Sequence, residues 1–167
     1  MTAGTVWRGK YIDVIKDGTW EYVNRAKGLG AAVVIAVTDE DELVLIEEYR
    51  VPLGRTCLAF PAGIVGDEDA GEDPAESARR ELEEETGYRA GRMERIADFA
   101  SSPGLTSETF TLFRAHDLVK VGKGGGVEGE DIAVRLVPIA DMGKVMRQAA
   151  ADGLALDVKL IACLRLL

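Results

Sequence analysis

Three glutamates in one short stretch have the residue type and the spacing to do chemistry. Glu81, Glu84 and Glu85 lie in the run RRELEEETGY at residues 79–88. In a helix, residues three and four apart share a face, so their carboxylates lie together, although like charges at this spacing and near the helix C-terminus are destabilising. A bound cation would offset both effects, and clustered carboxylate oxygens suit hard ions such as Mg²⁺ or Mn²⁺. The charge pattern alone leaves a solvated acidic helix face as the alternative.

The helix that carries these glutamates has clear start and stop signals. Asp73 is a suitable N-cap, Pro74 suits the first helical position, and Glu76 can complete a capping box. Gly87 is placed to end the helix in a left-handed conformation. The sequence therefore predicts a helix that begins at Pro74 and ends at Gly87.

Composition limits the partners of this chain. Its 167 residues fit one domain, and a content of 47% hydrophobic and 29% charged residues is typical of a soluble globular protein. The net charge of −9 argues against nucleic acid or an anionic membrane as the main partner, but allows a small anionic substrate where arginines or metal ions offset the field. Cys57 and Cys163 form no CxxC pair, and no apolar stretch has signal-peptide or membrane-spanning character, so we expect a cytoplasmic protein.

The remaining pattern mixes strands and helices without regular alternation. Two short alternating segments around Lys16-Asp17-Gly18 predict an N-terminal hairpin, with aromatic residues that could stack on a base, bury in a subunit interface or simply pack. Strands are predicted at residues 31–37, 43–46, 57–60, 92–100, 109–116 and 132–138, and closing helices at 141–151 and 156–166. This order favours an α+β fold, an αβα sandwich with a mixed β-sheet, over a doubly wound sheet.

Three further features have open interpretations. Arg50 is either a phosphate ligand or the partner of Glu47 or Glu48 in a surface ion pair. The glycine run at residues 122–126 lacks the context of a phosphate-binding loop and is interpreted as a flexible lid or hinge. His116, without a partner motif, is expected to be an ordinary strand residue.

The central stretch resembles the Nudix hydrolase signature, G-x5-E-x7-R-E-U-x-E-E-x-G-U, where U is an apolar or similar residue. The nine defined positions are filled by Gly66, Glu72, Arg80, Glu81, Leu82, Glu84, Glu85, Gly87 and Tyr88. The resemblance implies a mixed-sheet αβα sandwich in which the signature forms a loop-helix-loop that binds a divalent metal.

Residues outside the signature are similar to the branch that hydrolyses ADP-ribose and nucleoside-diphosphate sugars. They are Pro61-Ala62-Gly63, Ser102-Pro103-Gly104, Glu108 and the acidic segment 128–132. Two departures stand out. Eight residues separate Gly63 from Glu72 where the branch has five, so Gly63 or Gly66 could begin the signature, and Ala59-Phe60 lacks the glutamate typical of ADP-ribose enzymes.

The resemblance implies roles for individual residues. Glu81 and Glu85 are the expected metal ligands, with Glu84 as a third and the Ala62 carbonyl as a further ligand to Mg²⁺ or Mn²⁺. Glu128 is the first choice for general base and Glu130 the second. The alternative is that both are surface residues of an exposed acidic loop, without a catalytic role. Arg80 would orient the carboxylates or form a plain structural ion pair, and Glu72 would support the loop. The expected substrate-binding residues are Arg50, Pro103, Glu108 and Trp20.

The implied activity is metal-dependent cleavage of ADP-ribose, or a related nucleoside-diphosphate sugar, into a nucleoside monophosphate and a sugar phosphate. The alternatives are a nucleoside-triphosphate or dinucleoside-polyphosphate pyrophosphohydrolase, a non-catalytic ligand-binding module and a structural interaction domain. We expect residues 29–167 to form the hydrolase domain, and residues 1–28 to form a hairpin extension through which the branch implies a homodimer.

Overall fold

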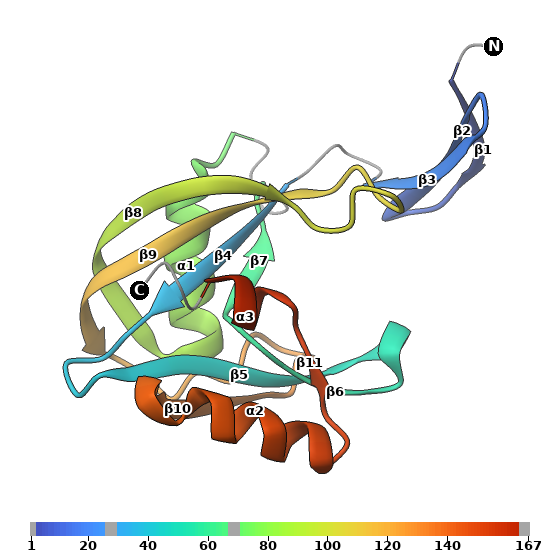
Figure 1. Cartoon of the computed structure of the whole chain (residues 1–167). Coiled ribbons are helices and arrows are strands. Elements are labelled where there is room, and N and C mark those ends of the chain that lie inside the picture. The colour runs from blue at the N-terminus through green and yellow to red at the C-terminus, as the bar shows by residue number, and fades with distance from the viewer. Residues whose placement is uncertain (1–2, 26–29, 67–70, 164–167) are drawn as a thin grey trace.

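The structure is a computed structural model that describes residues 3–25, 30–66 and 71–163, with side chains described as far as residue 161 (Figure 1). The elements in chain order are β1 (Gly4–Arg8), β2 (Ile12–Asp17), β3 (Trp20–Arg25), β4 (Ala31–Ala36), β5 (Glu42–Arg50), η1 (Val51–Leu53), β6 (Arg55–Ala59), β7 (Ala62–Ile64), α1 (Pro74–Thr86), β8 (Tyr88–Ala100), β9 (Thr109–Lys120), β10 (Ile132–Pro138), η2 (Ile139–Asp141), α2 (Met142–Ala151), β11 (Ala155–Leu156) and α3 (Lys159–Cys163).

Two four-stranded sheets form the body of the molecule. One has the order β7-β4-β9-β8, in which β4 and β9 are parallel and the other pairs antiparallel. The other has the order β10-β5-β6-β11, in which only the short β11 is parallel to its neighbour. The predicted mixed sheet is therefore confirmed.

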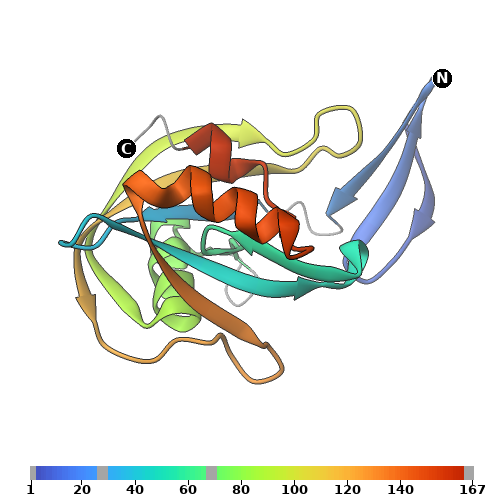
Figure 2. The ribbon, with the colours of Figure 1, turned by 60° about the horizontal axis from the view of Figure 1, so that its bottom comes forward.

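Helices cover both sides of these sheets because the buried strands send alternate side chains to opposite faces. On β4, Val34 packs in one apolar cluster with Leu82 of α1. Its neighbour Ile35 packs in a second cluster with Met142 of α2 and Leu160 of α3. All five side chains are almost fully buried. In the turned view, α2 and α3 lie together on one side of the strands and α1 on the other (Figure 2). The αβα sandwich is confirmed.

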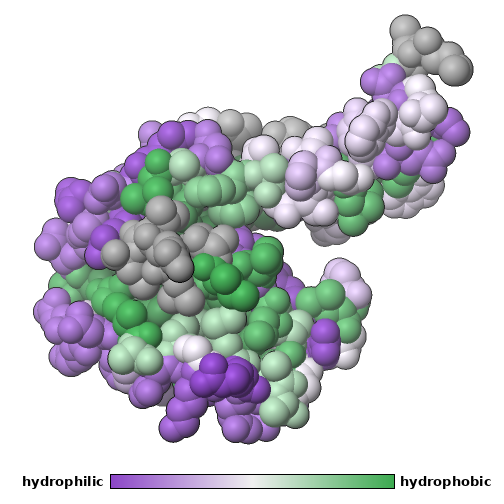
Figure 3. Space-filling model, in the orientation of Figure 1, coloured by the Kyte–Doolittle hydropathy of each residue, from purple (hydrophilic) through white to green (hydrophobic). Residues whose placement is uncertain are grey.

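The N-terminal strands form a separate antiparallel sheet that projects from the body (Figure 1). The predicted hairpin is present as β2 and β3, and β1 adds a third strand to it. This arm is attached through Val23, whose backbone N–H donates to Leu105 O (2.9 Å) and whose carbonyl accepts from Ser107 N (3.0 Å). Figure 3 shows the arm projecting from one end of the body.

The helices differ partly from the prediction. α1 has the expected bounds, with Asp73 Oδ1 accepting from Ala75 N and Gly87 at φ 69°. Glu76 pairs with Arg79 instead of completing a capping box. The predicted helix over residues 156–166 is wrong at its start, because Leu156 belongs to β11 and pairs with Leu58 of β6. No helix in the described part of the chain is long and apolar enough to cross a membrane.

Candidate active site

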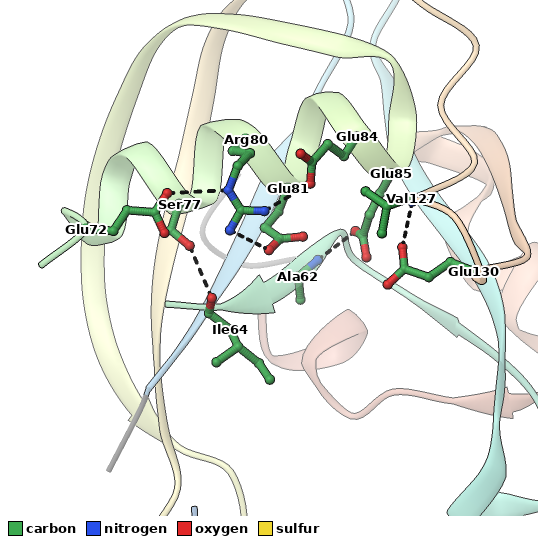
Figure 4. Close-up of polar contacts among 10 residues, drawn as sticks. All are labelled: Ala62, Ile64, Glu72, Ser77, Arg80, Glu81, Glu84, Glu85, Val127 and Glu130. Atoms are coloured by element: carbon green, nitrogen blue, oxygen red, sulfur yellow. Dashed lines mark hydrogen bonds and ion pairs between the residues drawn. The ribbon is translucent and has the colours of Figure 1, made fainter. Parts of the chain in front are cut away.

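Strand β7 and helix α1 are joined at both ends of the strand (Figure 4). At one end, the fully buried Ser77 hydroxyl donates to Ile64 O (3.4 Å). At the other, Ala62 N donates to Glu85 Oε2 (3.0 Å). Between them, Gly63 lies so close to α1 that an added Cβ would overlap the carboxyl carbon of Glu81. A side chain at position 63 would therefore displace the Glu81 carboxylate, whereas Gly66 (φ 78°) lies in the turn that follows. Residues 67–70, in the expected insertion, lie outside the described residues.

Among the carboxylates in the described part of the chain, Glu85 has the most strongly shifted pKa. Its residue is 5% exposed, on the face of α1 that also buries Leu82 and Thr86. The pKa of Glu85 is raised to about 8, because burial and the nearby charges of Glu81, Glu48 and Glu130 outweigh the lowering effect of the Ala62 N–H bond. A buried carboxylate with like charges around it is stabilised in its ionised form by a cation.

Arg80 holds the other carboxylates of the signature in place. Its guanidinium lies 3.1 Å from Glu81 Oε1, 3.0 Å from Glu84 Oε2 and 3.4 Å from Glu72 Oε1 (Figure 4). Burial lowers the pKa of Arg80, but the hydrogen bond to Glu72 and the charges of Glu81, Glu84 and Glu72 outweigh it and raise the pKa above its ordinary value. These contacts are the ones required by both expected roles of Arg80, the orientation of carboxylates and a structural ion pair.

The late acidic loop brings Glu130, and not Glu128, to this cluster. Glu130 Oε2 accepts from Val127 N (3.0 Å), and its charge acts on both Glu85 and Glu48. Figure 4 shows its carboxylate on the side of Glu85. Glu128 is exposed. The first choice for general base is therefore not the residue that this geometry places near the signature helix.

The glycine run is anchored, in contrast to the lid or hinge expected from its composition. Gly125 N donates to Glu85 O (2.8 Å) and Gly126 N to Glu84 O (3.0 Å), so the run binds the last carbonyls of α1. Gly124 has φ 71°, and a Cβ there would overlap the backbone of Glu85 and Thr86. Only glycine allows so close an approach.

Glu48 belongs to the cluster and was missed as a site residue by the sequence analysis. Burial raises the pKa of Glu48, the charge of Arg50 lowers it, and the charge of Glu130 raises it. Strand alternation was the available signal, because Glu48 is two residues beyond the fully buried Ile46 and so shares its face. Glu47, on the opposite face, pairs instead with Arg135 (2.6 Å).

These residues fit a divalent cation in their chemistry, although they are not assembled into a cage. No group of three or more His, Cys, Asp or Glu side chains within residues 3–25, 30–66 and 71–161 is arranged to hold a metal ion. The carboxylates of Glu81, Glu85, Glu48 and Glu130 nevertheless act on one another, and Glu72 Oε2 is buried with no hydrogen-bond partner among the described groups. A hard cation would satisfy such an oxygen-rich set. Ala62 lies at this edge of the strand, beside Glu85.

A pocket of about 500 Å³ opens beside the cluster and shares its β7 wall. Ala62 and Gly63 line it, as do Arg50 and Glu108, two of the residues expected to bind substrate. Arg50 also forms the alternative ion pair, with Glu48 Oε2 at 2.9 Å. Glu108 is held by Arg25, at 2.5 Å. The pocket thus places cations next to the carboxylate cluster.

The other two expected substrate-binding residues meet in a second pocket, of about 400 Å³. Trp20 and Tyr22 of β3 line it together with Pro103 of the loop between β8 and β9. Trp20 is 62% exposed. His116 lies away from both pockets and pairs with Glu94 across β8 and β9 (2.7 Å), consistent with an ordinary strand residue.

The chain is similar in sequence to known pyrophosphatases. The chain is 38% identical over 119 residues to an ADP-ribose pyrophosphatase of Bacillus subtilis, covering 68% of this chain and 63% of that protein. It is 33% identical over 148 residues to a GDP-mannose pyrophosphatase of Cronobacter sakazakii, covering 83% and 73%. A methanol dehydrogenase activator of Bacillus methanolicus is 43% identical over 110 residues, covering 66% and 57%. The chain thus spans about three fifths of the length of the first and third of these relatives.

The same relationship is visible in three dimensions. A crystal structure of an ADP compounds hydrolase matches with a TM-score of 0.69 and 25% identity, over 88% of this chain and 81% of that one. The family model of the NUDIX domain matches residues 28–156, which include the signature helix, the cluster and β7. The chain therefore belongs to the NUDIX domain family.

Proposed function

We propose that this chain is a divalent-metal-dependent pyrophosphohydrolase that cleaves ADP-ribose or a related nucleoside-diphosphate sugar. The observation that carries the proposal is the shared wall of the site: Ala62 and Gly63 contact the signature carboxylates and also line the pocket that contains Arg50. A diphosphate whose oxygens lie against Arg50 would have its bridging bond beside Glu81 and Glu85. Relatives named for ADP-ribose and GDP-mannose support this substrate class.

In this reaction water adds to one phosphorus while the bond from that phosphorus to the bridging oxygen breaks. The products are a nucleoside monophosphate and a sugar phosphate. Glu81 and Glu85 would hold Mg²⁺ or Mn²⁺, with Glu84 and Ala62 as further candidates, and the ion would neutralise charge on the diphosphate. Arg80 keeps Glu81 and Glu84 oriented.

Glu130 is the better placed candidate for general base, because its charge acts on both Glu85 and Glu48. It would accept the proton that the attacking water releases. Arg50 would bind phosphate oxygens after exchanging its present partner, Glu48.

Trp20 and Pro103 offer the base an apolar platform in the second pocket. Glu108, held by Arg25, would accept a hydrogen bond from the substrate. All carboxylates of the signature are present, which favours an enzyme over a non-catalytic binding module.

We also infer that residues 1–28 form an extension to the hydrolase domain of residues 29–167 and join two copies in a homodimer. The arm exposes large aromatic side chains, with Trp7 at 54% and Tyr11 at 70% exposure, and such residues are common at protein interfaces. The buried free thiol of Cys57 is consistent with a cytoplasmic protein.

The decisive experiment offers a panel of ADP-ribose, GDP-mannose, UDP-glucose, diadenosine polyphosphates and dNTPs with Mg²⁺ or Mn²⁺, and identifies the products by mass. We expect metal-dependent cleavage of a nucleoside-diphosphate sugar into two monophosphates. Glu81→Gln should lower turnover by at least about 100-fold. Glu76→Gln is the matched control, since Glu76 is exposed on the same helix and pairs only with Arg79 among the contacts described. Full activity in Glu81→Gln would overturn the metal assignment.

A further inference from the structure

A charged pair from the C-terminal segment lines the larger pocket. Asp157 Oδ2 and Lys159 Nζ are 2.7 Å apart, and their side chains are 21% and 22% exposed. Both border the pocket that also contains Arg50 and Ala62. The NUDIX match ends at residue 156, so this pair lies just beyond the part of the chain that the family shares.

The pair is fixed relative to the carboxylate cluster. Asp157 N donates to Leu58 O (3.0 Å), directly after the two residues of β11 that pair with β6. Lys159 N donates to Asp157 Oδ1 (2.8 Å), and the next residue, Leu160, is fully buried in the core. Because β6 leads within a few residues to Ala62 of β7, a short stretch of chain connects the anchor of this pair to the strand that contacts Glu85.

Charge distinguishes this pair from a phosphate site. Lys159 shares the pocket wall with its carboxylate partner Asp157, whereas Arg50 lines the pocket and its partner Glu48 is not among the lining residues described. Lys159 Nζ also lies 5.3 Å from the centre of the Phe110 ring, on the floor of the pocket. A neutral pair adds little attraction for a diphosphate, but it offers both kinds of hydrogen-bonding group, carboxylate oxygens that accept and an ammonium that donates. Adjacent sugar hydroxyls both donate and accept hydrogen bonds, so they can use both groups.

We propose that Asp157 and Lys159 are specificity-determining residues that bind adjacent hydroxyls of a sugar in the substrate. This inference rests on the proposed function and specifies which part of the substrate the C-terminal segment binds. The hydroxyls belong either to the distal sugar or to the ribose of the nucleoside, and the chemistry of recognition is the same for both. A site that hydrogen-bonds a hydroxyl rejects analogues that lack it, because its own polar groups are left without partners.

The test compares the full-length chain with Asp157→Asn and Lys159→Met. Lys144→Met is the matched control, since Lys144 is an exposed lysine of α2 outside the pocket. The substrates are ADP-ribose, the β-methyl ester of ADP, which lacks the distal sugar, and an ADP-ribose whose adenosine ribose is 2′,3′-dideoxy. We expect both variants to lower kcat/KM for ADP-ribose by about 10- to 100-fold, mainly through KM. The concentration of Mg²⁺ that gives half-maximal activity should not change.

The analogues decide which hydroxyls are bound. If the pair binds the distal sugar, the variants and the wild type will cleave the methyl ester equally well, and if it binds the nucleoside ribose, they will cleave the dideoxy analogue equally well. An equal loss on all three substrates, or no loss, would overturn the inference. Lys159→Met is the more informative variant, because Asp157 also caps the start of α3 whereas the Lys159 ammonium anchors no backbone group in the described contacts.

Failure of the proposed function is distinguishable from failure of this inference. If the wild type cleaves none of the substrates in the panel, the proposed pyrophosphohydrolase activity is wrong. Calorimetry of ADP-ribose, without metal, then tests the pair directly. Binding that is weakened in Lys159→Met and unchanged in Lys144→Met supports it, and binding that is equal in all three proteins, or absent, refutes it.

Discussion

The buried carboxylate of Glu85 makes the stability of the metal-free protein depend on pH. Burial and the charges of Glu81, Glu48 and Glu130 raise the pKa of Glu85 from 4.5 to about 8. The folded chain therefore keeps this proton up to about pH 8, whereas the unfolded chain releases it above about pH 4.5. Since the folded state binds more protons in this window, stability falls as pH rises through it, and the loss is complete above pH 8.

The magnitude follows from the pKa difference. At about 1.4 kcal/mol per pKa unit, ionising Glu85 costs the folded state about 5 kcal/mol at pH 9, about 3 kcal/mol at pH 7 and less than about 1 kcal/mol at pH 5. Glu85→Gln is neutral at every pH, and its amide oxygen can still accept from Ala62 N. We expect this variant to be more stable than the wild type at pH 9, by an amount that disappears towards pH 5.

Urea denaturation in EDTA, at one-unit steps from pH 5 to pH 9, measures this difference. Mg²⁺ should stabilise the wild type at pH 8 to 9 by mass action and have little effect on Glu85→Gln. The control is Glu83→Gln on the same helix, because Glu83 is only half-buried and pairs with Arg89. The stability of this variant should depend on pH in the same way as that of the wild type. Parallel curves for wild type and Glu85→Gln across the pH range would refute the buried, charge-crowded environment of Glu85.

Two further predictions concern the late loop and the arm. An added Cβ at Gly126 would overlap Glu130 Oε2, whereas one at Gly129 meets nothing within 4 Å, and both residues have positive φ (81° and 98°). Gly126→Ala should displace the Glu130 carboxylate and lower kcat by about 100-fold. Gly129→Ala is the control and should leave kcat near the wild-type value. Equal losses in both variants would show that backbone strain, and not the displacement of Glu130, is responsible. Light scattering over a concentration series should give a dimer that Trp7→Ser weakens, and a monomer at every concentration would exclude the dimer.

Local features of the sequence were sufficient to predict the signature helix and the layers around it. Asp73, Pro74 and Gly87 determine where α1 begins and ends through contacts within a few residues, so they can be recognised without the fold. Continuous apolar stretches such as residues 31–36 predict strands covered on both faces, which requires helices on both sides. The match of nine signature positions added the family and the candidate metal ligands.

The composition of the site depended on contacts between distant segments. Glu47 and Glu48 are adjacent and chemically identical. Strand alternation puts Glu48 on the same face as Arg50, but only the tertiary structure brings Glu130 and Glu85 to that face. In the same way, the glycine run pairs with the C-terminal carbonyls of α1, which no local pattern encodes.

For the glutamates of α1, too, local sequence predicts some properties and the tertiary structure determines others. Their spacing on one helix face, and hence the need for a cation, follows from the sequence, because helical periodicity is local. The burial that raises the pKa of Glu85, and the placement of Glu130 and not Glu128 beside it, follow only from the tertiary structure. Desolvation and charge–charge interactions depend on distances between groups, and the packing of separate segments determines those distances.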